Sequence, residues 1–253
     1  MRALTVVLAV SAALAVPLAC TANPAPSIAG PTGIIMVPNT EVVGRNGADV
    51  GLHFFDESDN GTEYDARIWH INVGLCDSVE LSVTPWSESN GDEESYTTFG
   101  VKWAPLAEPE DCMGLAVGVY DLGEEFDDDS EDEHTAIWYI VGSKSLTDIE
   151  AGKRPVRFNL GLELADSAWG PYWLKAHVLH PEGATDSPNL FLGLDAEVAD
   201  WLTILADTNE FEDFSFGARV NPCENLNIDL LSLDGWGHER EFTLGIGYHV
   251  TWD

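Results

Sequence analysis

The sequence predicts an all-β fold, an antiparallel transmembrane β-barrel of about 12 strands. Three observations predict it. Residues 241–252 alternate between large apolar and small or polar side chains. Similar short alternating runs recur along the chain between turn-rich breaks. The connections between these runs alternate between tight turns and longer acidic loops. This is the pattern of a barrel with lipid outside, water inside and short turns at one end.

The N-terminus predicts export. A basic start at Arg2 is followed by an apolar stretch and by the small residues Cys20 and Ala22, which is typical of a secretory signal peptide cleaved after Ala22. The alternative is a lipidated Cys20, disfavoured by Pro17. We therefore expect three parts: a signal peptide at 1–22, an N-terminal periplasmic or plug-like segment at 23–45, and a β-barrel at 46–253.

Apart from the run at 135–146, which is mixed, the predicted strands present an apolar face with a spacing of two residues, as Val50, Leu52 and Phe54 do in the first. In order, the predicted strands are 47–55, 63–75, 79–86, 96–104, 113–122, 135–146, 156–164, 189–198, 201–207, 214–220, 226–232 and 241–252.

The opposite faces of these strands carry polar and charged residues, which predicts a water-filled lumen. A two-layer sandwich would place the same residues on its solvated surface, so strand number, strand length and closure favour the barrel. The candidate lumen-lining residues are Lys102, Arg157, Glu163, Asp195, Glu197, Arg219, Asp229 and His249.

An even number of strands places both termini on the short-turn, periplasmic side. Residues 172–180 could form an extra strand, but this would reverse the order of short and long connections. We therefore interpret residues 165–188 as one long outer loop. Cys76, Cys112 and Cys223 then lie on the periplasmic side. Three free thiols are favoured, with a Cys76–Cys112 disulfide as the alternative.

Composition excludes a basic nucleic-acid-binding face. Removal of Arg2 with the signal leaves 10 Lys and Arg against 44 Asp and Glu, a formal charge of −34. Such acidity is typical of a heavily solvated surface or of cation binding. The acid run at 124–133 offers weak candidate ligands for a divalent cation, while a merely solvated loop is the leading interpretation. These candidates are Asp127, Asp129, Glu131 and Glu133.

Other chemistry is disfavoured by the sequence. His177 and His180, near Glu182 and Asp186, could ligate a metal, but such a pair in a loop is usually incidental. No G-x-S-x-G motif is present, so we expect no enzyme activity and no cofactor beyond weakly bound divalent cations.

Two resemblances add to this interpretation. The ending Gly247, Tyr248, Val250 and Trp252 resembles the C-terminal signal of outer-membrane barrels, apart from the trailing Asp253. Residues 30–40, GPTGIIMVPNT, resemble the N-terminal signature of YjbH-like outer-membrane proteins, a family associated with exopolysaccharide. Weaker matches follow in order at 72–81, 116–122, 143–146, 190–195 and 216–219.

The YjbH-like resemblance implies a β-barrel and supplies no catalytic residues. The leading functional prediction is thus a bacterial outer-membrane barrel that acts as a small channel or as a component of envelope polysaccharide export. Its expected partners are outer-membrane lipid, the barrel-assembly machinery through the last strand, and polysaccharide. The alternatives are a structural or adhesive outer-membrane protein with cation-bridged acidic loops, and a soluble exported β-sandwich that binds carbohydrate.

Overall fold

The computed structural model describes residues 24–59, 62–89, 93–108, 112–123, 136–146, 154–165, 188–209, 213–233 and 241–252. Several predictions fall outside these ranges: the signal peptide, the acid run with Asp127, Asp129, Glu131 and Glu133, and the segment containing His177 and His180. Within the described residues no helix is long and apolar enough to cross a membrane.

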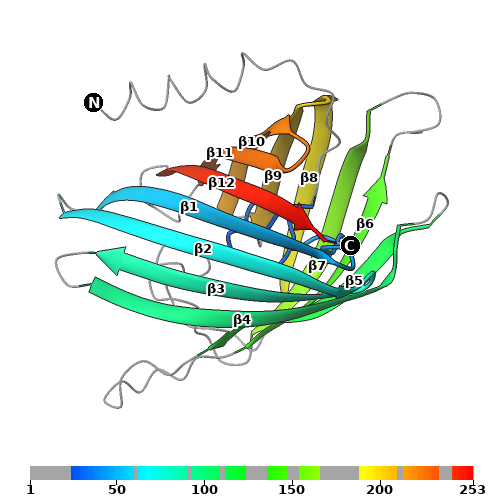
Figure 1. The fold of residues 1–253 in the computed structure, drawn as a ribbon, viewed down its shortest axis with the longest axis horizontal. Helices are drawn as coiled ribbons and strands as arrows, with labels where there is room; N and C mark the ends of the chain where they lie inside the picture. The colour runs from blue at the N-terminus through cyan, green and yellow to red at the C-terminus, as the bar shows by residue number, and fades with distance from the viewer. Residues whose placement is uncertain are drawn as a thin grey trace.

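Twelve antiparallel strands form one closed barrel, which confirms the predicted fold class (Figure 1). Each strand pairs with the next in sequence, and β1 pairs with β12 to close the sheet. The strands are β1 Gly47–Asp59, β2 Thr62–Cys76, β3 Val79–Ser89, β4 Glu93–Leu106, β5 Gly114–Gly123, β6 Ile137–Ser145, β7 Val156–Ala165, β8 Asn189–Ala199, β9 Leu202–Asn209, β10 Asp213–Cys223, β11 Leu226–Leu233 and β12 Glu241–Thr251.

Alternation decides which side chains face outward. In β7 the buried residues Asn159 and Glu163 alternate with the exposed Leu160, Leu162 and Leu164. Because a strand has a period of two, the apolar faces read from the sequence lie on the outside of the barrel. A single closed sheet also rules out the predicted alternative of a two-layer sandwich.

The alternation breaks once in β5. Phe99 pairs with Leu122 and Val101 with Val119, so Tyr120 and Asp121 together stand opposite Gly100. Asp121 has φ of 60°, a conformation that Asp tolerates better than most residues. This bulge turns Tyr120 and Asp121 both inward, each 5% exposed. The period-two pattern predicted for this strand therefore holds only as far as Val119.

The interior of the barrel is packed, where the sequence had predicted a water-filled lumen. Buried apolar side chains of the wall, including Ile68, Val141, Phe191 and Leu205, form one core with Ile28, Ile34, Ile35 and Val37, which precede β1. This explains the mixed pattern of β6: Ile137, Tyr139 and Val141 face the core while Trp138 and Ile140 face outward.

Candidate functional site: the occupied lumen

Residues 24–44, hereafter the luminal segment, lie inside the barrel as a compact loop without regular strands. Isolated bridges join Pro26 to Thr32 and Gly33 to Pro38. Ile28 N donates to Ile35 O at 2.7 Å, and Gly30 adopts a φ of 118° that L-residues rarely adopt. These local bonds satisfy only part of the main chain, so the remaining buried amides and carbonyls need partners on the wall.

Two carboxylates of the wall accept hydrogen bonds from the main chain of the luminal segment. Glu80 of β3 accepts from the amides of Thr32 and Val43, each at 2.8 Å, and from the Thr32 hydroxyl. Asp207 of β9 accepts with one oxygen from three successive amides, those of Ile35, Met36 and Val37, at 3.1, 2.7 and 3.2 Å. Several amides directed at one oxygen form an anion-binding concavity.

Two cations of the wall bind carbonyls of the same segment. Lys102 Nζ of β4 donates to Thr32 O at 2.7 Å, and Arg219 Nη2 of β10 donates to Ile34 O at 3.2 Å. Lys102 is the cross-strand neighbour of Glu80, and Arg219 that of Asp229, to which it donates from Nε at 2.8 Å and from Nη2 at 3.0 Å. Each buried cation thus has a carboxylate beside it, as buried charges require.

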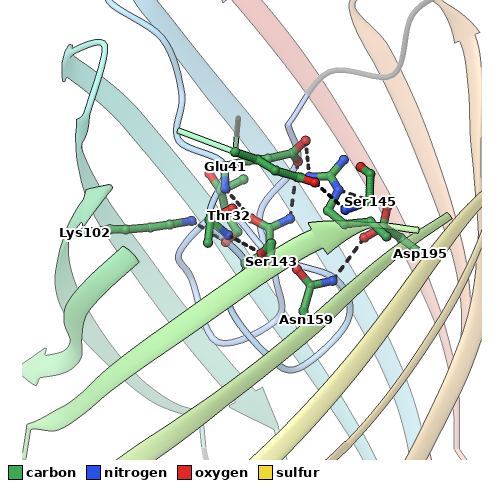
Figure 2. A network of polar contacts seen from close by, with 11 residues as sticks. Thr32, Glu41, Lys102, Ser143, Ser145, Asn159 and Asp195 are labelled. Atoms are coloured by element: carbon green, nitrogen blue, oxygen red, sulfur yellow. Dashed lines mark hydrogen bonds and ion pairs between the residues drawn. The ribbon is translucent and has the colours of Figure 1, made fainter. Parts of the chain in front are cut away.

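A second cluster binds the luminal segment where it approaches β6–β8 (Figure 2). Thr40 N donates to Ser143 Oγ at 3.1 Å, and Asn159 Nδ2 joins this group to Asp195 Oδ2 at 3.2 Å. Arg157 forms an ion pair with Glu41 and lies 3.6 Å from Asp195. Burial opposes ionisation of Glu41, but the charge and hydrogen bond of Arg157, with smaller contributions from Lys102 and Asn39, together outweigh it and hold the pKa of the Glu41 carboxyl below its usual value.

Gly74 permits the close passage of the luminal segment along β2. A Cβ at this position would lie 2.1 Å from Gly44 O and 2.2 Å from Val43 O. Both atoms are backbone and cannot move aside as a flexible side chain would. Gly74 therefore fits the contact between the segment and the wall, a role that alternation alone does not predict.

A small pocket remains between the luminal segment and β7–β10. Its volume is about 40 Å³, and its charged lining comes from Glu41, Arg157, Asp195, Glu197 and Arg219. One water occupies about 10–15 Å³ of such a cavity, so the pocket holds a few waters at most. It is too small to admit a sugar.

The structure brings most of the predicted lumen-lining residues to the segment or its surroundings. Lys102, Arg157 and Arg219 contact the luminal segment directly, while Asp195, Glu197 and Asp229 surround these contacts. Glu163 and His249 contact the wall instead: Glu163 accepts from Tyr120 Oη at 2.9 Å, and His249 Nδ1 lies 2.6 Å from Asp49 Oδ1.

Glu80 and Asp207 were missed by the sequence analysis as site residues. A signal for both was available, because each follows an apolar alternation that places it inward: Glu80 between Val79 and Leu81, and Asp207 after Ala206. What the sequence does not reveal is that main-chain amides far away in the chain are their partners.

The described residues contain no group of three or more His, Cys, Asp or Glu that could hold a metal ion. Cys76, Cys112 and Cys223 are free thiols.

No protein-family model matches the chain, and no curated protein sequence matches it either. Solved structures show some likeness. An outer-membrane channel from Pseudomonas putida F1 is 12% identical with a TM-score of 0.48, over 85% of this chain and 99% of that one. The N-terminal β-barrel domain of Pseudomonas aeruginosa OprF is 13% identical with a TM-score of 0.26, over 82% and 99%. A mutant of the Rh. blastica porin is 9% identical with a TM-score of 0.30, over 81% and 98%. Likenesses of this degree do not establish a function.

Proposed function

We propose that the chain is a bacterial outer-membrane β-barrel that serves as a small channel, closed in this conformation by the luminal segment. The observation that carries the proposal is the outer face of the closed barrel. Large apolar side chains are exposed there on every strand except β11. Among the outward-facing strand side chains that the structure describes, only Arg67 and Lys144 are charged. In water such a surface would aggregate, whereas lipid would cover it.

The height of the apolar surface matches a membrane. Along β12 and its end, exposed aromatic side chains run from Phe242 to Trp252. Ten residue steps of about 3.4 Å, tilted by about 40°, span about 26 Å along the barrel axis, close to the roughly 25 Å of an outer-membrane apolar band. Trp138 and Trp103, exposed at opposite ends of their strands, fit the two aromatic girdles.

The channel part of the proposal depends on the luminal segment. It is joined to β1 by one turn, and polar contacts with Glu80, Lys102, Asp207 and Arg219 hold it in the lumen. If the segment left, these four side chains would line a polar passage of mixed charge. The segment occupies the space between these four side chains and leaves beside it a pocket of about 40 Å³, so conduction along this path requires its displacement.

Two measurements test the proposal. The folded protein in detergent should show heat-modifiable gel mobility and should insert into lipid vesicles. In planar bilayers it should give a mostly closed state with brief openings. Complete absence of openings in a protein that inserts correctly would contradict the channel and leave the barrel.

The second candidate is a structural or adhesive outer-membrane protein, and the packed interior favours it. A continuous apolar core that includes Phe191 and Leu205 adds stability without serving passage. Single-channel recording separates the two candidates, because a structural barrel gives no openings.

The finer predictions remain part of the proposal. The resemblance of residues 30–40 to YjbH-like proteins suggests a role in exopolysaccharide export, and this stretch lies within the luminal segment. A glycan could pass only after that segment left the lumen. The outward alternation of β12 supports recognition by the barrel-assembly machinery.

A further inference from the structure

The barrel wall binds the luminal segment mainly through main-chain atoms. Glu80 and Asp207 accept from five of its amides, while Lys102 and Arg219 donate to two of its carbonyls. These four wall side chains are 1%, 3%, 1% and 7% exposed, respectively. Charged partners shielded from water make the stronger class of hydrogen bond, so these contacts dominate the polar part of the attachment.

Apolar side chains supply the second part of the attachment. Ile28, Ile34, Ile35 and Val37 are at most 1% exposed and pack with the wall. Ile34 lies over Gly193, where a Cβ would approach its Cδ1 to 2.3 Å. Hydrogen bonds to the main chain can bind any polypeptide of suitable shape, whereas the packing around these four side chains selects small, branched apolar side chains.

None of the four charged residues is near the luminal segment in sequence. Asp207 is separated from Met36 by 171 positions and Arg219 from Ile34 by 185. The link between the segment and β1 is the turn at Arg45 and Asn46, both of which are exposed. The covalent link thus acts as a tether that raises the local concentration of the segment, while the contacts themselves are those of a receptor with a ligand.

We propose that the lumen formed by β1–β12 is a binding site for a polypeptide segment, occupied here by the chain's own residues 24–44, and that it binds such a segment without a covalent link to β1. The ligand class is a short looped peptide with successive free amides and branched apolar side chains. This binding site rests on the proposed function, because the bound segment is what keeps the proposed channel closed.

The test uses the full chain with a specific protease site inserted between Gly44 and Arg45. The folded protein is cut in detergent and passed through gel filtration. A fluorescent synthetic peptide of residues 24–44 is then added in excess. We expect the cut segment to remain bound, and the labelled peptide to exchange with it and saturate at one per barrel.

Matched variants show whether the main-chain contacts carry the binding. Asp207→Asn and Glu80→Gln should each weaken the binding of the labelled peptide by at least about 10-fold, because a neutral amide oxygen replaces the charged acceptor and one acceptor oxygen becomes a donor. Asp49→Asn and Glu163→Gln are the controls, since these buried carboxylates contact wall residues, and they should change the affinity less than threefold. A peptide N-methylated at Met36, whose amide lies 2.7 Å from Asp207, should bind at least about 10-fold more weakly than the parent peptide.

Three results would overturn the proposal. The labelled peptide could fail to bind a barrel that keeps its heat-modifiable mobility after the cut segment is removed. The barrel could lose that mobility as soon as the segment leaves. The N-methylated and parent peptides could bind equally. The assay needs no ion current, so a barrel that binds the peptide but never conducts would refute the channel and leave the binding site in place.

Discussion

Replacing Gly74 with alanine should displace the luminal segment and open the barrel. The added Cβ would lie 2.1 Å from Gly44 O and 2.2 Å from Val43 O, over 1 Å inside an ordinary contact. Both atoms are backbone, so the segment itself must retreat from β2. That retreat disturbs the 2.8 Å bond from Val43 N to Glu80.

Overpacking of a tight site costs about 1–3 kcal/mol. This cost falls on the closed state alone if the segment can leave, and it then corresponds to roughly a 5- to 150-fold rise in the ratio of open to closed channels. Open probability in planar bilayers measures the change directly.

Gly51→Ala is the matched control. Gly51 also faces the lumen, from β1, but its added Cβ would lie 3.5 Å from both Ile246 O and Pro26 Cγ, which is ordinary contact. We expect its open probability to equal that of the parent protein. If Gly74→Ala and Gly51→Ala behave alike, the contact of the segment with β2 at Gly74 does not close the channel.

Three further predictions concern pH, lipid and topology. The pKa of Glu41, which precedes β1, is lowered, so its ion pair with Arg157 stabilises the closed state fully at pH values above the usual pKa of 4.5 and is lost as the pH falls through the lowered pKa. Acid should therefore raise the open probability, and Glu41→Gln should remove that response. An unchanged acid response in this variant would exclude Glu41 as its source. Ile204→Arg on the outward face of β9 should destabilise the inserted barrel by about 2–4 kcal/mol in urea titrations in lipid, whereas the inward Thr203→Ser should leave the free energy of unfolding near that of the parent protein. Equal small effects of both variants would argue against a lipid-facing surface. Cys112 and Cys223 are exposed free thiols at the end of the barrel predicted to face the periplasm, so an impermeant maleimide should label them only after the outer membrane is permeabilised; labelling in intact cells would invert the topology.

The outer half of this structure was predictable from the sequence. Lipid-facing positions depend only on the local period of two, so the apolar runs such as Leu160, Leu162 and Leu164 identified the strands and their outward faces. Strand count and the order of pairing followed, because each antiparallel strand pairs with its neighbour in sequence. The alternation fails locally in β5, where the bulge at Asp121 reverses it, and no residue pattern predicts this bulge.

The contacts inside the barrel were decided by the tertiary structure alone. Inward-facing residues such as Phe191 and Leu205 look like exceptions in a polar lumen, and they became a core only because Ile34 and its neighbours pack against them. Lys102 and Arg219 could be predicted to face inward, but not to bind carbonyls of Thr32 and Ile34. Alternation along a strand is a local property that the chain carries at every position. A contact between a strand and a main chain 70 to 185 positions away depends on where the closed barrel leaves space, and no local period encodes that.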